Sequence, residues 1–247
     1  MSDLVATLRE QEQAWERRPL VRQLYRDWYQ ALVERLSDVD GVSVELGSGI
    51  GRLRQVAGTR VVLTDVEQTP WSDETVDALH LPYADESVAN IVMLDVFHHL
   101  GDPARFLNEA ERTLAPGGRL LLIEPYCSPV STPLYRGFHQ EHTDMSVADP
   151  FAPDPDVARA AFDSNQALPT LVFYRRLEEL QRRWPTLRVV ERKRFAFLLY
   201  PLSGGFTRRP LLPAPLYPAV RLIERALQPL APLLAFRCLV VVEKRGA

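Results

Sequence analysis

Four short apolar runs, separated by polar segments, dominate the first half of the chain. They are rich in Val, Ile and Leu, end near Gly, Pro or acidic residues, and occupy 42–45, 60–65, 90–96 and 119–123. Such runs predict buried β-strands. The polar segments between them favour helices, and one opens with Asp102-Pro103, a capping residue followed by a proline at the first helical position. Strands that alternate with helices predict a parallel sheet with right-handed crossovers.

Amphipathic helices are predicted ahead of this region. In residues 2–37, apolar side chains recur at steps of three and four, as in Tyr25, Trp28 and Tyr29. This spacing is typical of helices that lie on another surface. Packing against the edge of the sheet explains the pattern.

Residues 125–168 interrupt the alternation. Their prolines exclude long regular elements, apart from a short helical turn predicted at 135–138. The segment leaves the carboxyl end of a parallel strand, the edge at which open α/β sheets bind ligands. Long insertions at that edge are usually functional, so we expect this one to lie on the substrate side.

The last third of the chain predicts a helix at 170–183 and strands at 187–200 and 236–244. Between the two strands, residues 201–234 are rich in proline and contain an amphipathic helix at 217–227. Two interpretations fit this stretch. It closes the sheet edge as a helical hairpin, or its apolar, arginine-flanked surface rests on a membrane or covers an apolar substrate.

A glycine-rich loop follows the first strand. Glu45 closes that strand, and the sequence Gly47-Ser48-Gly49-Ile50-Gly51 leads into a possible helix at 52–57. Glycine allows backbone angles and close approaches that a Cβ atom forbids, and a following helix directs free N–H groups into the loop. Asp65 ends the second strand eighteen positions after Gly47, a spacing that places a carboxylate beside a ribose in a βαβ unit. The pattern predicts a nucleotide-type cofactor site.

Three further motifs follow in order, and together with the loop they resemble a known family. The four motifs are Glu45 to Gly51, Asp77 to Tyr83, His98-His99-Leu100 and Leu114 to Leu120. In this order they resemble the class I S-adenosylmethionine-dependent methyltransferases, in particular the small-molecule branch. The resemblance covers about residues 41–126. One departure is Ala89, where the family usually has an acidic residue, and it does not affect the cofactor positions.

The resemblance implies an α/β fold: a Rossmann-like, seven-stranded, mostly parallel sheet with helices on both faces, an antiparallel last strand and an N-terminal helical lid. It implies a single domain over residues 1–247. We divide that domain into a lid, a cofactor-binding core, a substrate-side insertion and a C-terminal part that includes the proline-rich insertion at 201–234. These parts are 1–40, 41–126, 127–168 and 169–247.

The resemblance also implies that S-adenosylmethionine is the cofactor, and it assigns roles in the loop. Glu45 is expected under the amino group of the cofactor's methionine. Gly47, Gly49 and Gly51 are expected to let the backbone pass close to the methionine and the ribose.

Five further positions complete the expected cofactor site. Asp65 would accept from the ribose hydroxyls, with Val66 against the adenine face. Asp77 would accept from the adenine N6 amine while the Ala78 N–H meets ring N1. Asp95 would line the channel beside the methionine carboxylate and the sulfonium. Carboxylates suit the ribose and N6 positions because the cofactor presents donors there.

Methyl transfer is an SN2 displacement from a sulfonium, and the leaving thioether is neutral, so the main requirement is alignment without water. A hydroxyl acceptor also needs a base, usually histidine. The candidates are His99, which is also explained as a packed, hydrogen-bonded histidine, and His139 and His142 in the substrate-side insertion. We expect no metal site: His139 and His142 lie near carboxylates, but no second pair supports them.

Composition argues against several other classes of protein. A formal net charge of −3 and a pI near 6.0 argue against a general nucleic-acid binder. Two distant cysteines form neither a disulfide framework nor a zinc site. The start of the chain lacks the pattern of a signal peptide and no apolar run reaches eighteen residues, so we expect a cytoplasmic protein. The sequence predicts no particular oligomeric state.

Two other classes compete with a methyltransferase. An NAD-type Rossmann oxidoreductase shares the glycine loop and later acidic residue, but its motif is G-x-G-x-x-G, and it gives no role to the Asp77 motif. A catalytically silent methyltransferase-like binding protein fits as well. The methyl acceptor is expected to be a small molecule, a glycan or a lipid-linked compound, which 201–234 would help to cover.

Overall fold

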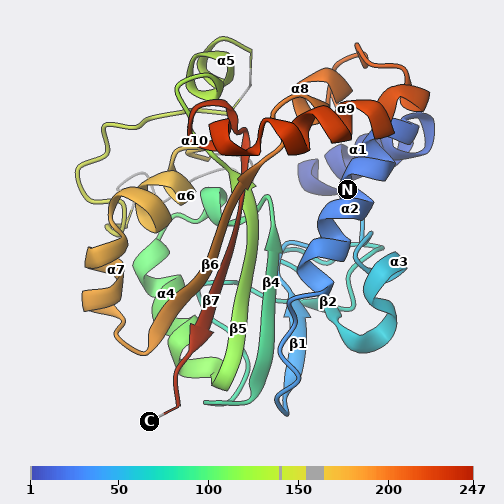
Figure 1. The fold of residues 1–247 in the computed structure, drawn as a ribbon. Coiled ribbons are helices and arrows are strands. Elements are labelled where there is room, and N and C mark those ends of the chain that lie inside the picture. The colour runs from blue at the N-terminus through green and yellow to red at the C-terminus, as the bar shows by residue number, and fades with distance from the viewer. Residues whose placement is uncertain (1, 139–140, 154–163, 247) are drawn as a thin grey trace.

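The computed structural model describes residues 2–138, 141–153 and 164–246, and a sheet of seven strands forms its centre (Figure 1). The strand order across the sheet is β3-β2-β1-β4-β5-β7-β6. The strands are β1 (Val42–Glu45), β2 (Val62–Asp65), β3 (Glu74–Thr75), β4 (Val88–Leu94), β5 (Leu114–Pro125), β6 (Leu187–Phe195) and β7 (Arg237–Lys244).

The strand directions agree with the expected mixed sheet. The five strands from β1 to β5 pair with one another in parallel. β7 lies between β5 and β6 and is antiparallel to both, with Leu122 opposite Val240 on one side and Lys193 opposite Leu239 on the other. The predicted antiparallel last strand is therefore confirmed. The carboxyl ends of β1, β2, β4 and β5 meet at one edge.

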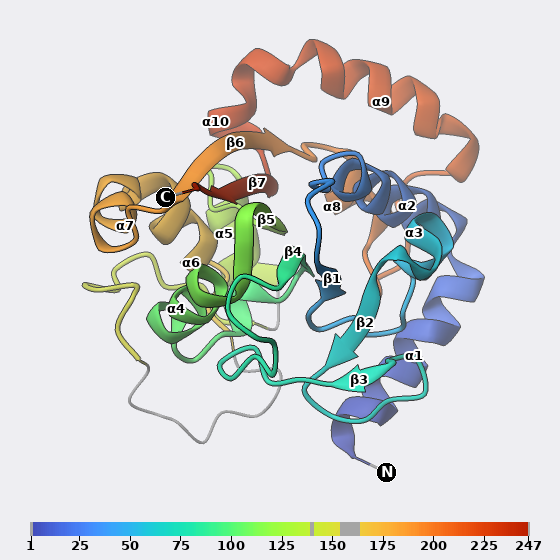
Figure 2. The ribbon, with the colours of Figure 1, turned by 90° about the horizontal axis from the view of Figure 1, so that it is seen from below.

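Helices cover both faces of the sheet (Figures 1 and 2). The alternation of side chains along a strand explains this, because Ile91 and Met93 point into one apolar layer while Val92 and Leu94 point into the other. The first layer contains α4 (Pro103–Thr113), α6 (Leu168–Thr170), the π-helical turn Leu171–Arg175 and α7 (Leu177–Arg183). The second contains α1 (Asp3–Arg17), α2 (Pro19–Val33) and α3 (Arg54–Ala57).

Local chemistry explains where two of these helices begin. The Asp102 carboxylate accepts from the Arg105 N–H at 2.9 Å, and Pro103 follows at the first helical position, so α4 starts where the sequence predicts. Residues 2–37 form two helices, and the second begins at Pro19, which fits the first turn of a helix because it has no N–H to leave unpaired.

An insertion connects β6 to β7 and lies over the N-terminal helices (Figure 1). This segment, residues 199–234, is named the roof here. It contains α8 (Leu199–Ser203), α9 (Tyr217–Ala226), α10 (Ala231–Leu234) and two short 3₁₀ turns, Ala214–Leu216 and Gln228–Leu230. The Arg18 guanidinium donates to the Gly205 carbonyl at 2.6 Å, and the Tyr217 hydroxyl donates to Asp27 at 2.6 Å. These hydrogen bonds join the roof to the N-terminal helices.

Several elements differ from their predicted bounds. β6 ends at Phe195 instead of 200 because Ala196 takes a φ of +61° and turns the chain away from the sheet. The helix predicted at 170–183 is divided by the π-helical turn. The strand predicted at 119–123 begins earlier, at Leu114, so Pro116 lies inside β5, where the pairing with β4 shifts register and Gly117 takes a φ of +80°.

The remaining element bounds change little. The short helical turn predicted at 135–138 is the end of α5 (Ser131–Phe138). The described chain also contains two other 3₁₀ turns, Gly58–Arg60 and Phe97–His99. β3 was not predicted.

Candidate cofactor and active site

The glycine-rich loop lies at the carboxyl end of β1, between β2 and β4. Its backbone requires glycine, since Gly47, Gly49 and Gly51 take φ values of +67°, +53° and +65°. Space is also limited at Gly47, where an added Cβ atom would lie 2.6 Å from Val96 Cγ2. The Ser48 N–H donates to the Thr64 carbonyl at 2.8 Å and ties the loop to β2. The loop is thus a tightly held backbone cradle.

Glu45 lies at the base of this cradle. Its side chain is 1% exposed, and its Oε2 atom has no hydrogen-bond partner among the described residues. Burial, reinforced by the nearby Asp65, raises the pKa of Glu45 well above its ordinary value. A buried carboxylate without a donor is costly, so the site favours a cationic or donor group at this position.

Asp65 faces the same loop from the end of β2. Its two carboxylate oxygens accept from the Gly49 N–H at 3.0 Å and from the Val66 N–H at 2.9 Å. Burial raises the pKa of Asp65, and these two N–H groups oppose the rise. Each oxygen keeps a further lone pair for a ligand hydroxyl. The Val66 side chain is largely exposed and is free to contact a flat ligand group.

Asp77 and Ala78 occupy a turn beyond β3. The Asp77 carboxylate accepts from the Leu79 N–H at 2.8 Å and contacts His80 Nδ1 at 2.9 Å. The side chain is exposed, and Ala78 is partly buried. Asp77 therefore already supports its own turn, and the expected contact with the adenine amine would add to these bonds.

Asp95, at the end of β4, belongs to a buried polar cluster. It has a φ of +60°, its carboxylate pairs with the Arg237 guanidinium, and it accepts from the Tyr25 hydroxyl at 3.1 Å. The Arg237 guanidinium lies 5.4 Å from the Trp28 ring centre and 4.3 Å from that of Tyr200, within cation–π range. Burial raises the pKa of Asp95, and Arg237 opposes the rise.

Sequence reasoning missed Arg237. One feature of the sequence could have indicated it: this arginine is a lone charge directly ahead of the apolar run of β7. An arginine buried in a strand needs a partner of opposite charge. The partner comes from a residue 142 positions earlier in the chain, which is beyond any local pattern.

His98 lies behind the active-site edge and is fully enclosed. Its Nδ1 atom lies 2.6 Å from a Glu124 oxygen, and the other oxygen of Glu124 accepts from the Val96 and Phe97 N–H groups. Burial alone would lower the pKa of His98, but Glu124 and Glu141 outweigh it and raise the pKa to about 10.

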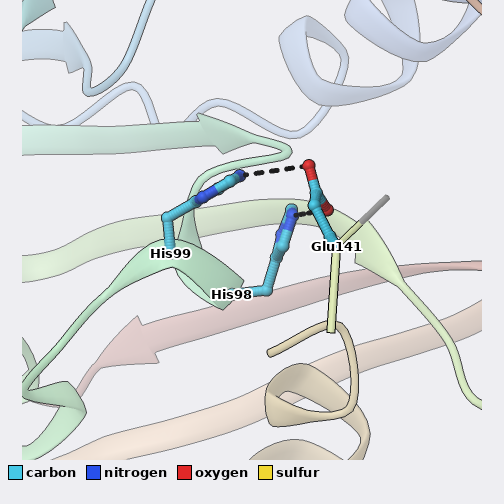
Figure 3. Close-up of side chains that lie close together, drawn as sticks. All are labelled: His98, His99 and Glu141. Carbon is cyan, nitrogen blue, oxygen red and sulfur yellow. Dashed lines mark hydrogen bonds and ion pairs between the residues drawn. The ribbon is translucent and has the colours of Figure 1, made fainter. Parts of the chain in front are cut away.

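His98 and His99 both point toward Glu141 (Figure 3). His98 Nε2 lies 3.3 Å from one carboxylate oxygen and His99 Nε2 lies 3.9 Å from the other. Gln166 donates its amide to the same carboxylate at 2.6 Å. Burial would raise the pKa of Glu141, but His98 and its other neighbours lower it well below the ordinary range. Sequence analysis did not predict this cluster.

Of the two other histidines predicted as catalytic, His142 is described, and it does not belong to this cluster. His142 is exposed, and its carbonyl accepts from the Gln166 N–H at 3.0 Å. His139 lies outside the described residues. Of the two candidates that the structure describes, His99 lies in the turn that follows β4, at the carboxyl edge of the sheet.

Residues 44–122 match a family model described as a methyltransferase domain. The matched segment runs from β1 through most of β5 and contains the glycine-rich loop, Asp65, Asp77 and Asp95. This part of the chain, about a third of its length, is therefore similar to a methyltransferase domain.

A curated relative supports this assignment. Methyltransferase GfsG of Streptomyces halstedii is 33% identical over 97 residues, which are 37% of this chain and 34% of that protein. An uncharacterized 37.1 kDa protein in transposon TN4556 of Streptomyces fradiae is 29% identical over 126 residues, or 49% of this chain and 33% of that protein. The matches thus span about a third of the length of each curated relative.

Solved structures share the fold of this chain at low sequence identity. A chain of a complex between the Trm112 methyltransferase activator of Haloferax volcanii and a protein described as a methyltransferase has a TM-score of 0.55 and 16% identity, covering 100% of this chain and 99% of that one. Geranyl diphosphate C-methyltransferase from Streptomyces coelicolor has a TM-score of 0.53 and 14% identity. The match covers 92% of this chain and 82% of that one.

The topology of the sheet also differs from that of an NAD-type oxidoreductase. Dinucleotide-binding folds have parallel strands in the order 3-2-1-4-5-6, whereas here an antiparallel β7 lies between β5 and β6. In the part of the chain that the structure describes, no helix combines the length and apolar character needed to cross a membrane.

Proposed function

We propose that this methyltransferase binds S-adenosylmethionine across the carboxyl ends of β1, β2 and β4 and transfers its methyl group to a small-molecule acceptor beneath the roof. The observation that carries the proposal is the Glu45 carboxylate, which is buried in the glycine cradle with one oxygen unpartnered.

The residues of the cradle fit this cofactor. The α-ammonium of its methionine supplies the donor that Glu45 Oε2 lacks, as a charge-assisted hydrogen bond. Gly47 has no side chain at a position where one would collide with Val96. We assign Asp65 and Val66 to the ribose and the adenine face, and Asp77 and Ala78 to the adenine edge.

The chemistry of the reaction explains the surroundings of Asp95. When bound, the sulfonium supplies an activated methyl group, and the protein must align the acceptor and exclude water. The fixed Arg237 guanidinium contacts the rings of both Trp28 and Tyr200, whose centres lie 5.8 Å apart, and holds these large side chains at the carboxyl edge of the sheet. We propose that they form the wall that keeps water from the transfer site.

We assign the base for a hydroxyl acceptor to His99. Its neighbour His98 is enclosed and held by Glu124, so it cannot reach an acceptor. His99 is about one-fifth exposed and lies 3.9 Å from Glu141, which would stabilise the imidazolium that forms after proton transfer.

Calorimetry with S-adenosylhomocysteine and NAD tests the cofactor. We expect binding of S-adenosylhomocysteine and none of NAD, and Asp65→Ala should weaken the former about ten- to a hundredfold. Unchanged affinity in Asp65→Ala would contradict the proposed pocket. A labelled-methyl assay on fractionated lipid, glycan and metabolite pools identifies the acceptor, and binding without transfer to any pool would favour a silent binding protein.

A second candidate, a lipid-linked acceptor reached at a membrane surface, is favoured by the outer surface of the roof. Most of the exposed large apolar side chains in the described chain lie there: Leu211, Leu216, Leu222, Ile223, Leu230 and Leu233. An apolar surface with nearby arginines suits an interfacial position. We expect wild-type protein to co-sediment with anionic liposomes and a Leu222→Ser, Ile223→Ser double variant to do so less. Val190→Ser, an exposed position on β6, is the control. Absence of wild-type co-sedimentation would exclude the membrane contact.

A further inference from the structure

We infer that His98, His99 and Glu141 form a binding site for a divalent first-row transition-metal ion. The three side chains converge from two parts of the chain, the turn after β4 and the segment after α5 (Figure 3). Their ligand atoms all lie within 4.8 Å of one another. Two imidazole nitrogens and one carboxylate are ligands that Zn²⁺, Fe²⁺ and Co²⁺ share.

The distances in the cluster are close to those of a ligand set. Metal–nitrogen and metal–oxygen bonds of roughly 2.0–2.1 Å in a tetrahedral site place neighbouring ligand atoms about 3.3 Å apart. His98 Nε2 lies 3.3 Å from Glu141 Oε2, and His99 Nε2 lies 3.9 Å from Oε1. Binding an ion therefore needs only a small rotation of His99 or Glu141.

Glu124 and Gln166 hydrogen-bond to the candidate ligands and orient them, as such neighbours do in known metal sites. Metal-binding histidines usually donate their second ring nitrogen to a carboxylate or carbonyl. Glu124 lies 2.6 Å from His98 Nδ1 and is itself fixed by two backbone N–H groups, so Nε2 is directed at the site. Gln166 donates to Glu141 Oε2 at 2.6 Å and fixes the carboxylate.

Charge also favours a cation here. Glu124 and Glu141 bring two formal negative charges, Arg237 is already paired with Asp95, and a bound ion would take the place of the proton between His98 Nε2 and Glu141. Asp95 offers an alternative cluster with His98 and Glu124. That set is the weaker one, because Asp95 is committed to Arg237 and Tyr25 and Glu124 to backbone donors.

Three protein ligands leave at least one position on the ion open, and His99 and Glu141 are partly exposed, so an acceptor oxygen can reach it. This role rests on the proposed methyl transfer. The bound ion would lower the pKa of an acceptor hydroxyl or enol, which loses its proton to solvent while its oxygen stays bound for attack on the methyl carbon. The ion would then replace His99 as the group that activates the acceptor.

Metal binding is tested on the full chain after treatment with a chelator. We expect Zn²⁺ calorimetry to show one equivalent bound, and Co²⁺ to give visible absorption bands of a low-symmetry site. His99→Ala and Glu141→Gln should each weaken binding at least about a hundredfold, and Gln166→Ala roughly tenfold. His142→Ala is the matched control, since this residue adjoins Glu141 but lies outside the cluster, and it should bind as wild type.

The readouts separate this inference from the proposed function. Each variant is also titrated with S-adenosylhomocysteine, which reports that the domain is folded. A wild-type protein that binds S-adenosylhomocysteine but no Zn²⁺ or Co²⁺ overturns the metal site and leaves the methyltransferase proposal intact. Equal Zn²⁺ affinity in wild type, His99→Ala and Glu141→Gln overturns it as well. Metal binding without cofactor binding supports the site and contradicts the proposed function.

Discussion

Two residues at the start of the cofactor loop show opposite ways of preparing a site. Gly47 contributes by what it lacks, because any side chain there would enter space filled by Val96. Glu45 contributes a polar group that the protein leaves unsatisfied. Both features cost stability in the free protein and are recovered when a ligand binds, which is the usual pattern of a preorganised site.

Replacing Gly47 with alanine should reduce cofactor affinity by at least about tenfold. The new Cβ would lie 2.6 Å from Val96 Cγ2 and adopt a φ of +67°, so the loop must move. Gly58→Ala is the control, since Gly58 also has a positive φ but an added Cβ meets nothing within 4 Å. Both variants should lose stability in urea unfolding, and only Gly47→Ala should lose binding of S-adenosylhomocysteine in calorimetry. Equal affinities in the two variants would show that the loop does not contact the cofactor.

The affinity for S-adenosylhomocysteine should rise with pH through the range above 4.5. Burial and Asp65 raise the pKa of Glu45 in the free protein, so its proton is held to higher pH than usual, whereas a bound ammonium requires the carboxylate. Binding then releases a proton, and higher pH favours it. Glu45→Gln cannot release this proton, so its affinity should be lower and change less between pH 5.5 and 7.5. If calorimetry shows the same pH dependence of affinity in wild type and Glu45→Gln, the proposed role of Glu45 is wrong.

At the scale of elements, the contact between the roof and the N-terminal helices depends on a few polar pairs. Asp27 on α2 accepts from the Tyr217 hydroxyl at 2.6 Å and pairs with Arg221 at 2.8 Å, both on α9. The two partners lie about 190 residues from Asp27 in the chain, so these contacts set how the roof sits on α2.

Asp27→Ala should loosen α9 without unfolding the sheet. The change leaves Tyr217 and Arg221 without their acceptor, at a cost of about 1–3 kcal/mol. Amide hydrogen exchange of residues 217–226 should therefore become roughly five- to a hundredfold faster, while exchange in β4 and β5 stays unchanged. Asp38→Ala, an exposed residue that follows the same helix, should leave both regions as they are.

The elements also show which parts of the fold a sequence can predict. β1, β2 and β4 are short apolar runs with a glycine or an acidic residue at their ends, and burial on both faces leaves a strong pattern. β3 leaves none, because it consists of Glu74 and Thr75, both exposed. The end of β6 depends on the positive φ of Ala196, a conformation that the local sequence does not demand.

The candidate site likewise combines residues that a local sequence pattern reveals with residues that it does not. Glu45, Asp65 and Asp95 each end a strand, so the parallel order of the strands brings them to one edge. Arg237 and Glu141 arrive from segments whose position depends on the antiparallel β7 and on the irregular chain after α5. Their contacts with Asp95 and His98 span 142 and 43 residues, and no local spacing encodes them.

For the whole molecule, the placement of β7 between β5 and β6 affects how the chain folds. β6 pairs only with β7 among the described strands, so β6 cannot join the sheet before β7 does. The segment from β1 to β5 contains its own parallel pairings and can assemble first, leaving the edge of β5 open. Because β7 pairs with β5 across about half of the sequence, its pairing is a slow, high-contact-order step. Pulse-labelling hydrogen exchange during refolding should therefore show β6 and β7 gaining protection together, after β1 and β4, and until then the open edge of β5 is the region of the intermediate most exposed to aggregation.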